Sequence, residues 1–120
     1  MGRIIMKWGG GLISDKSTLC TPRKNRISAL ADCVSTLADL GHDIIIVHGA
    51  GSFGHMRARE YKLAEGNIPD FEQHNAISKV RSDMDTLHQL VTDSLGERDI
   101  FSHPPRDFVL NTGPTFQGDL

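Results

Sequence analysis

The chain has 120 residues, of which 38% are apolar and 23% are charged, and its formal net charge is −2. This composition is that of an ordinary globular protein and excludes a disordered or fibrous chain. The length allows one domain at most, or part of a larger one. The small negative charge gives no reason to expect nucleic acid or an anionic membrane as a partner.

The cysteines and the apolar runs indicate where the protein resides. Cys20 and Cys33 form no C-x-x-C pair and suggest neither a disulfide framework nor a zinc site. The apolar run at residues 4–6 is too short for a signal peptide, and no segment approaches the length of a membrane span. We therefore expect a reduced, cytoplasmic protein.

Residues 3–8 predict a first strand, whose continuous apolar centre is typical of a buried parallel strand. The strand ends at Gly9, Gly10 and Gly11. Three consecutive glycines favour positive φ angles or the very close approach of a ligand to the backbone, although a flexible turn explains them equally well. Lys7 precedes them, so a cation and bare backbone share the end of the strand.

The next two elements complete a βαβ unit. A helix is predicted from about Asn25 to Leu40, with Gly41 as its C-terminal cap, because apolar residues recur at helical spacing (Ile27, Leu30, Val34 and Leu37). A second strand is predicted from about Asp43 to Val47. Strand, helix and strand in this order favour a right-handed, parallel pairing.

The second strand leads into a second glycine-rich turn at residues 49–54, and a helix-compatible segment follows at 56–63. This order places free backbone N–H groups and the positive end of a helix dipole at one point, which suits a phosphate group. His55 lies at the entrance of the helix, where its ring could donate to the same anion. We predict a phosphate site at this turn.

The remaining chain predicts a long helix from about Phe71 to Leu95, closed by Gly96, and then a strand at 107–110 with a hairpin partner at 115–117. The apolar face of the long helix includes Ile77, Val80, Met84, Leu87 and Val91.

Other interpretations of the second turn are weaker. Residues 49–54 satisfy G-x-G-x-x-G, but a dinucleotide site needs a further strand that ends in an acidic residue, and residues 64–70 contain no such strand. No Gly-Lys-Ser/Thr follows, which excludes a Walker A loop. His48 and His55 lack the companion ligands of a metal site, and His48 could simply bond a backbone group.

Two segments resemble a known family. Residues 6–16 resemble the K-x-G-G-S-x-I-T-x-K opening of amino-acid-kinase-fold enzymes, and residues 47–61 resemble the H-G-G-G-S-F-G-H segment of isopentenyl phosphate kinases. The final G-S-F-G-H discriminates within the superfamily, in which fosfomycin kinases are the nearest confusable group. Two departures from the pattern matter: Gly11 replaces a serine, and Ala50 replaces a glycine, which requires that position 50 needs no positive φ.

The resemblance implies an α/β fold of three αβα layers with a mainly parallel sheet. Family members are longer, so residues 1–120 would be the N-terminal, phosphate-acceptor-binding part of a kinase domain, without the C-terminal nucleotide-binding part and inactive alone. The implied reaction is the phosphorylation of isopentenyl phosphate by ATP with Mg²⁺, in an archaeal-type mevalonate route, and a homodimer is one assembly it allows. Alternatives are another small-molecule kinase of the same fold, of fosfomycin type, or a non-catalytic anion-binding or assembly module.

The resemblance also implies a set of site residues. ATP phosphates would contact Lys7, Gly9, Gly10, Gly11 and Gly51. The acceptor phosphate would lie near the backbone of Ala50 and Gly54 and accept a hydrogen bond from His55. Catalysis would use His55, Lys7 and a second lysine, Lys16, and no residue is assigned to a metal. The acceptor phosphate is itself the anionic nucleophile, so positioning and charge neutralisation replace a carboxylate base. An isoprenoid tail could contact Phe71, Ile77, Val80 and Met84, for which plain core packing is the alternative.

Overall fold

The computed structural model describes residues 2–63, 73–104, 109–112 and 116–118. In chain order the elements are β1 (Arg3–Trp8), α1 (Gly10–Ile13), α2 (Lys24–Asp39), β2 (Asp43–His48), the 3₁₀ turn η1 (Gly51–Phe53), α3 (His55–Glu60), α4 (Gln73–Ser94), β3 (Val109–Thr112) and β4 (Phe116–Gly118). The bounds of β1, α2 and β2 agree with the sequence prediction to within one residue.

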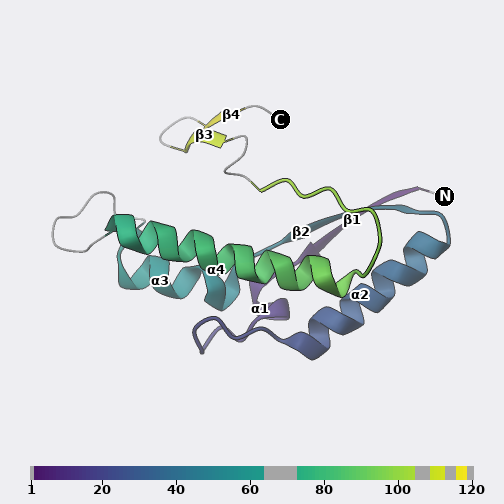
Figure 1. The fold of residues 1–120 in the computed structure, drawn as a ribbon, viewed down its shortest axis with the longest axis horizontal. Coiled ribbons are helices and arrows are strands. Elements are labelled where there is room, and N and C mark those ends of the chain that lie inside the picture. Colours follow the sequence, from purple (N-terminus) through teal and green to yellow (C-terminus); the bar gives the residue numbers. More distant parts are fainter. Residues whose placement is uncertain (1, 64–72, 105–108, 113–115, 119–120) are drawn as a thin grey trace.

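The predicted βαβ unit is confirmed. β1 and β2 pair in parallel from Arg3↔Asp43 to Trp8↔His48, and α2 connects them. Gly41 follows α2 with φ +92°, as expected for a helix-terminating glycine. Figure 1 shows helices α1 to α4 gathered on one side of the two strands. The α/β class and the parallel sheet expected from the sequence are therefore present.

The two strands bury only one of their faces within the described residues. Side chains alternate along both strands, because successive residues of a strand point to opposite faces. Ile5, Ile45 and Val47 are 70%, 45% and 52% exposed on the open face, whereas Met6 and Trp8 pack against the helices. The apolar centre of β1 is thus half exposed here. A third layer would have to cover the open face.

The core lies between the closed face of the sheet and the helices. Trp8 and Phe53 are 1% and 2% exposed, and the apolar stripes of α2 and α4 pack around them. These stripes contain Ile27, Ala31, Val34, Leu87 and Val91. Because Trp8 ends β1 and Phe53 lies in η1, the core extends to the two glycine-rich turns and packs against them.

The C-terminal part agrees in outline with the prediction. The described part of α4 runs from Gln73 to Ser94, within the predicted range, and residues 71 and 72 lie outside the described residues. Gly96 has φ +74° after the helix. β3 and β4 pair antiparallel, which confirms the hairpin, with a register irregularity between Val109 and Asn111. In the described ranges, no helix is both long and apolar enough to cross a membrane.

Candidate functional site

The two glycine-rich turns meet at one edge of the sheet. β1 and β2 are parallel, so the α1 loop (residues 9–13) and the η1 loop (residues 49–54) leave the sheet at the same end. A Cβ added to Gly49 would lie 2.8 Å from the nitrogen of Gly10, and one added to Gly10 would overlap the backbone of Gly51. The two loops therefore contact each other through bare backbone.

Positive φ angles, one of the explanations offered for the first glycine run, are not present there. Gly9 has φ −62°, and Gly10 and Gly11 belong to the short helix α1. The other explanation was the very close approach of a ligand to this backbone, and it stays a prediction; the group that lies against Gly10 in the structure is the backbone of the η1 loop. A larger residue at position 10 would push the two loops apart.

The η1 loop contains one left-handed residue. Gly51 has φ +51°, which favours glycine strongly. Ala50 has φ −98° and ψ −39°, an ordinary right-handed conformation, so alanine is tolerated there. Position 50 therefore needs no positive φ, which was the condition for alanine in place of the glycine of the family pattern. A Cβ on Gly54 would lie 2.7 Å from the Cβ of Ala50, which explains why position 54 remains glycine.

Three backbone N–H groups of the two loops have no acceptor among the residues that the structure describes. The first N–H groups of any helical turn have no partner within that turn. In the α1 loop the N–H groups of Leu12 and Ile13 both donate to the carbonyl of Gly9. For the N–H groups of Gly10, Gly11 and Gly51, no acceptor lies among the described residues. An anion bound between the loops could accept hydrogen bonds from both.

The three predicted catalytic side chains lie around these loops in different ways. His55 is exposed at the start of α3, directly after the η1 loop. Lys16 is exposed, and its aliphatic stem lies over Gly11, whose added Cβ would be 2.6 Å from Lys16 Cε. Lys7 alternates with buried Trp8, so its side chain leaves β1 on the open face of the sheet. A serine at position 11 would require the flexible end of the Lys16 side chain to move.

An ion pair holds α3 against α4. Arg57 Nε lies 2.6 Å from Asp83 Oδ2, and both side chains are about one-fifth exposed. The hydrogen bond from Arg57 to Asp83 raises the pKa of Arg57. Burial raises the pKa of the neighbouring Cys20 thiol, and Asp83 raises it further. The ion pair fixes the helix that begins with His55, and no sequence motif indicated it.

Two buried serines join the loops. Ser14 Oγ donates to the carbonyl of Gly10 at 2.7 Å and accepts from the N–H of Ser52 at 3.0 Å. Ser52 Oγ accepts from the N–H of Thr21 at 3.2 Å. Both serine residues are 0% exposed. The sequence reasoning overlooked Ser14, although it lies within the segment that carries the family resemblance.

His48 connects the end of β2 to α4. Its Nδ1 lies 3.0 Å from the carbonyl of Gly49, and its Nε2 lies 3.0 Å from His88 Nδ1. His88 Nε2 in turn lies 2.9 Å from Ser102 Oγ. The contact with Gly49 agrees with the structural interpretation of His48. In the described part of the chain, no group of three or more His, Cys, Asp or Glu side chains could hold a metal ion.

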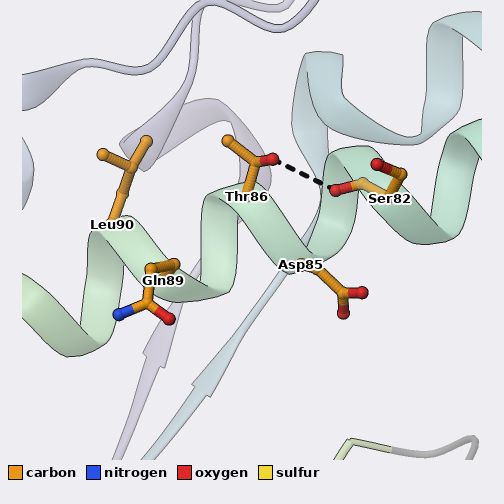
Figure 2. Close-up of a pocket in the computed structure, with 5 residues that line it drawn as sticks. All are labelled: Ser82, Asp85, Thr86, Gln89 and Leu90. Atoms are coloured by element: carbon orange, nitrogen blue, oxygen red, sulfur yellow. Dashed lines mark hydrogen bonds between the residues drawn. The ribbon is translucent and has the colours of Figure 1, made fainter.

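The residues proposed to contact an isoprenoid tail lie in different surroundings. Met84 Sδ would lie 3.7 Å from a Cβ on Gly54, so this side chain is next to the η1 loop. Val80 is half-buried and Ile77 is 38% exposed, while Phe71 lies outside the described residues. An open depression lies along the exposed side of α4, and Figure 2 shows its lining residues: Ser82, Asp85, Thr86, Gln89 and Leu90. None of these belongs to the glycine loops, so the depression is separate from the candidate site.

Comparison with known proteins gives consistent matches. Residues 2–101 match the model of the amino acid kinase family. The chain is 36% identical over 94 residues to an isopentenyl phosphate kinase of Thermoplasma acidophilum, covering 78% of this chain and 36% of the relative. It is 26% identical over 115 residues to an isopentenyl phosphate kinase of Methanocaldococcus jannaschii, covering 88% of this chain and 44% of that one.

Solved structures agree with the sequence matches. The crystal structure of the Thermoplasma acidophilum isopentenyl phosphate kinase product complex superposes with a TM-score of 0.76 at 30% identity, covering 98% of this chain and 47% of that one. Another isopentenyl phosphate kinase structure superposes with a TM-score of 0.80 at 26% identity, covering 98% and 50%. The chain thus spans between about a third and a half of the length of these relatives.

Proposed function

The chain belongs to the amino acid kinase family, and we propose that it is the N-terminal, phosphate-acceptor-binding part of a kinase that phosphorylates isopentenyl phosphate with ATP. The observation that carries this proposal is the convergence of two glycine loops in which the N–H groups of Gly10, Gly11 and Gly51 have no protein acceptor among the described residues. The names and the 36% and 26% identities of its relatives support the choice of substrate. A cytoplasmic location and a homodimer remain part of the same proposal.

The chemistry needs two polyanions to be held in line while their repulsion is offset. The N–H groups of Gly10, Gly11 and Gly51 would donate to ATP phosphates, and Lys16 would neutralise charge above the α1 loop. His55 would donate to the acceptor phosphate beside Ala50 and Gly54. The acceptor is already an anion, so the chain needs to position it and does not need to deprotonate it. This division of tasks fits a site made of backbone donors, lysines and one imidazole.

The donor set also fits ATP and Mg²⁺. Bare backbone N–H groups approach phosphate oxygens closely, and lysines act as phosphate-binding point charges. Mg²⁺ bridges phosphate oxygens and neutralises their charge when it is bound with the nucleotide. Proteins commonly hold it through the substrate phosphates and one or two carboxylates, so the chain's contribution here would be the two glycine loops and Lys16.

We expect the full-length protein to transfer phosphate from ATP to isopentenyl phosphate in preference to other acceptors. The measurement is steady-state kcat/KM with ATP and Mg²⁺ for isopentenyl phosphate, fosfomycin, acetylglutamate and UMP. Isopentenyl phosphate should give the highest value, because the loops are proposed to hold a phosphate acceptor and Met84 offers an apolar contact beside them.

Each other outcome has a defined meaning. A preference for fosfomycin would assign the protein to the other kinase type with a similar loop. A preference for acetylglutamate or UMP would contradict the assignment of the acceptor. Saturable binding of phosphate-type ligands without turnover would favour a non-catalytic anion-binding module. The 120-residue chain alone should not turn over, because it spans only about a third to a half of the length of these relatives.

A further inference from the structure

Ser14 is the residue through which the two glycine loops are hydrogen-bonded. Its Oγ donates to the carbonyl of Gly10 at 2.7 Å and accepts from the N–H of Ser52 at 3.0 Å. A serine hydroxyl has a single hydrogen to donate, and here it is committed to the α1 loop. The lone pair that accepts from Ser52 is committed to the η1 loop. The side chain is 0% exposed, so water cannot substitute for either bond.

The hydroxyl of Ser14 also occupies the space that a side chain at position 51 would need. A Cβ on Gly51 would overlap Ser14 Oγ and would crowd the carbonyl of Gly10. Gly51 has φ +51°, so the η1 loop turns its bare Cα toward Ser14. The missing side chain at position 51 and the buried hydroxyl at position 14 are complementary, and together they set the separation of the two loops.

Other hydrogen bonds attach the segment after Ser14 to the η1 loop and do not use the Ser14 hydroxyl. The N–H of Cys20 donates to the carbonyl of Ser52 at 3.1 Å, and the N–H of Thr21 donates to Ser52 Oγ at 3.2 Å. Arg23 Nε donates to the carbonyl of Ser14 at 3.1 Å, which holds the backbone of Ser14 in place. Removal of the hydroxyl therefore breaks the bond between the glycine loops while these other attachments remain.

We propose that Ser14 is a positioning residue for phosphoryl transfer, whose hydroxyl sets the distance between the two glycine loops and so between the two reacting phosphates. The proposal rests on the proposed function. Each loop keeps its own donors when the hydroxyl is lost, so each ligand still binds. What changes is the alignment of the two ligands, and a displacement of about 1 Å costs on the order of a hundredfold in rate.

The test uses Ser14→Ala in the full-length protein, with Ser14→Thr as the variant that keeps the hydroxyl. Ser52→Ala is the matched control, since it removes another fully buried serine hydroxyl but leaves the bond from the Ser52 N–H to Ser14 Oγ. For each protein, kcat and KM are measured with ATP and the preferred acceptor. Amide hydrogen exchange of residues 49–54 is measured separately, without substrates.

We expect Ser14→Ala to lower kcat about ten- to a hundredfold, with both KM values within about threefold of the parent value. Ser14→Thr should recover most of the rate, and Ser52→Ala should cost less than Ser14→Ala. The Ser52 amide should exchange faster in Ser14→Ala. If Ser14→Ala does not fold, Ser14→Cys keeps the volume with a weaker hydrogen bond, and it should show the same split between kcat and KM.

An unchanged kcat in Ser14→Ala would overturn the proposal. A loss confined to one KM, or an equal loss in Ser52→Ala, would overturn it as well. The exchange measurement separates this failure from failure of the proposed function. Faster exchange of the Ser52 amide in a protein with no kinase activity would retain the link between the loops and reject the reaction. Unchanged exchange of the Ser52 amide in a protein with kinase activity would retain the reaction and reject the link between the loops.

Discussion

Gly51→Ala in the full-length protein is expected to lower kcat/KM at least a hundredfold and to destabilise the fold. The new methyl group would overlap Ser14 Oγ, and the residue would be held at φ +51°. Overpacking costs about 1–3 kcal/mol, and the left-handed conformation costs about 1–2 kcal/mol for alanine. The loops would separate to relieve the overlap, so the phosphates would lose their alignment. Activity assays and urea unfolding, followed by the fluorescence of buried Trp8, measure the two effects.

Gly96→Ala is the matched control for this substitution. Gly96 also has a left-handed φ, +74°, but an added Cβ there meets nothing within 4 Å. It should therefore lose about 1–2 kcal/mol of stability for the backbone conformation and keep full activity. Equal losses of activity in both variants would show that strain alone, without the contact between the loops, explains the result at position 51.

His55→Ala is expected to lower kcat about a hundredfold while the Kd for ATP stays nearly constant. The imidazole is proposed to donate to the acceptor phosphate, and the loss of one donor aimed at developing charge costs on the order of 3 kcal/mol. His55 is exposed at the first residue of α3, so its removal should leave the stability almost unchanged. Steady-state kinetics and calorimetric titration with ATP separate the two quantities.

His42→Ala provides the comparison for the imidazole. His42 precedes β2, at the end of the sheet opposite to the glycine loops, and its Nδ1 accepts from the N–H of Gly2. This substitution should leave kcat unchanged. An unchanged rate in His55→Ala would exclude the proposed contact with the acceptor. A defect limited to ATP binding would assign His55 to the nucleotide instead.

The secondary structure was predictable because local signals agreed with one another. The helical spacing of Ile27, Leu30 and Val34 and the glycine at position 41 identified α2 and its end. The apolar run at 43–47 identified β2, and parallel pairing followed from the intervening helix. The family resemblance assigned both glycine loops to ATP phosphates, but their meeting at one edge of the sheet was found only in the structure.

The contacts between the loops were not predictable from local pattern. The sequence indicated that positions 9–11 require glycine. It could not show whether the reason is a positive φ angle or a group that lies close to the backbone. The partner of Gly10 lies about 40 residues later in the chain, at Gly51. The pairing of Arg57 with Asp83 was not predictable either, because it depends on how α3 packs on α4. Such tertiary contacts carry no signal in spacing.

The most direct test of the central claim is a ¹H–¹⁵N spectrum of the full-length protein titrated first with ADP and then with isopentenyl phosphate. The claim is that the N–H groups of Gly10, Gly11 and Gly51, for which the described part of the chain offers no acceptor, donate to phosphoryl oxygens. The amide resonances of Gly10, Gly11 and Gly51 should therefore shift with saturation. Saturable shifts confined to the depression on α4, at Ser82, Asp85 and Gln89, with the glycine amides unmoved, would contradict it.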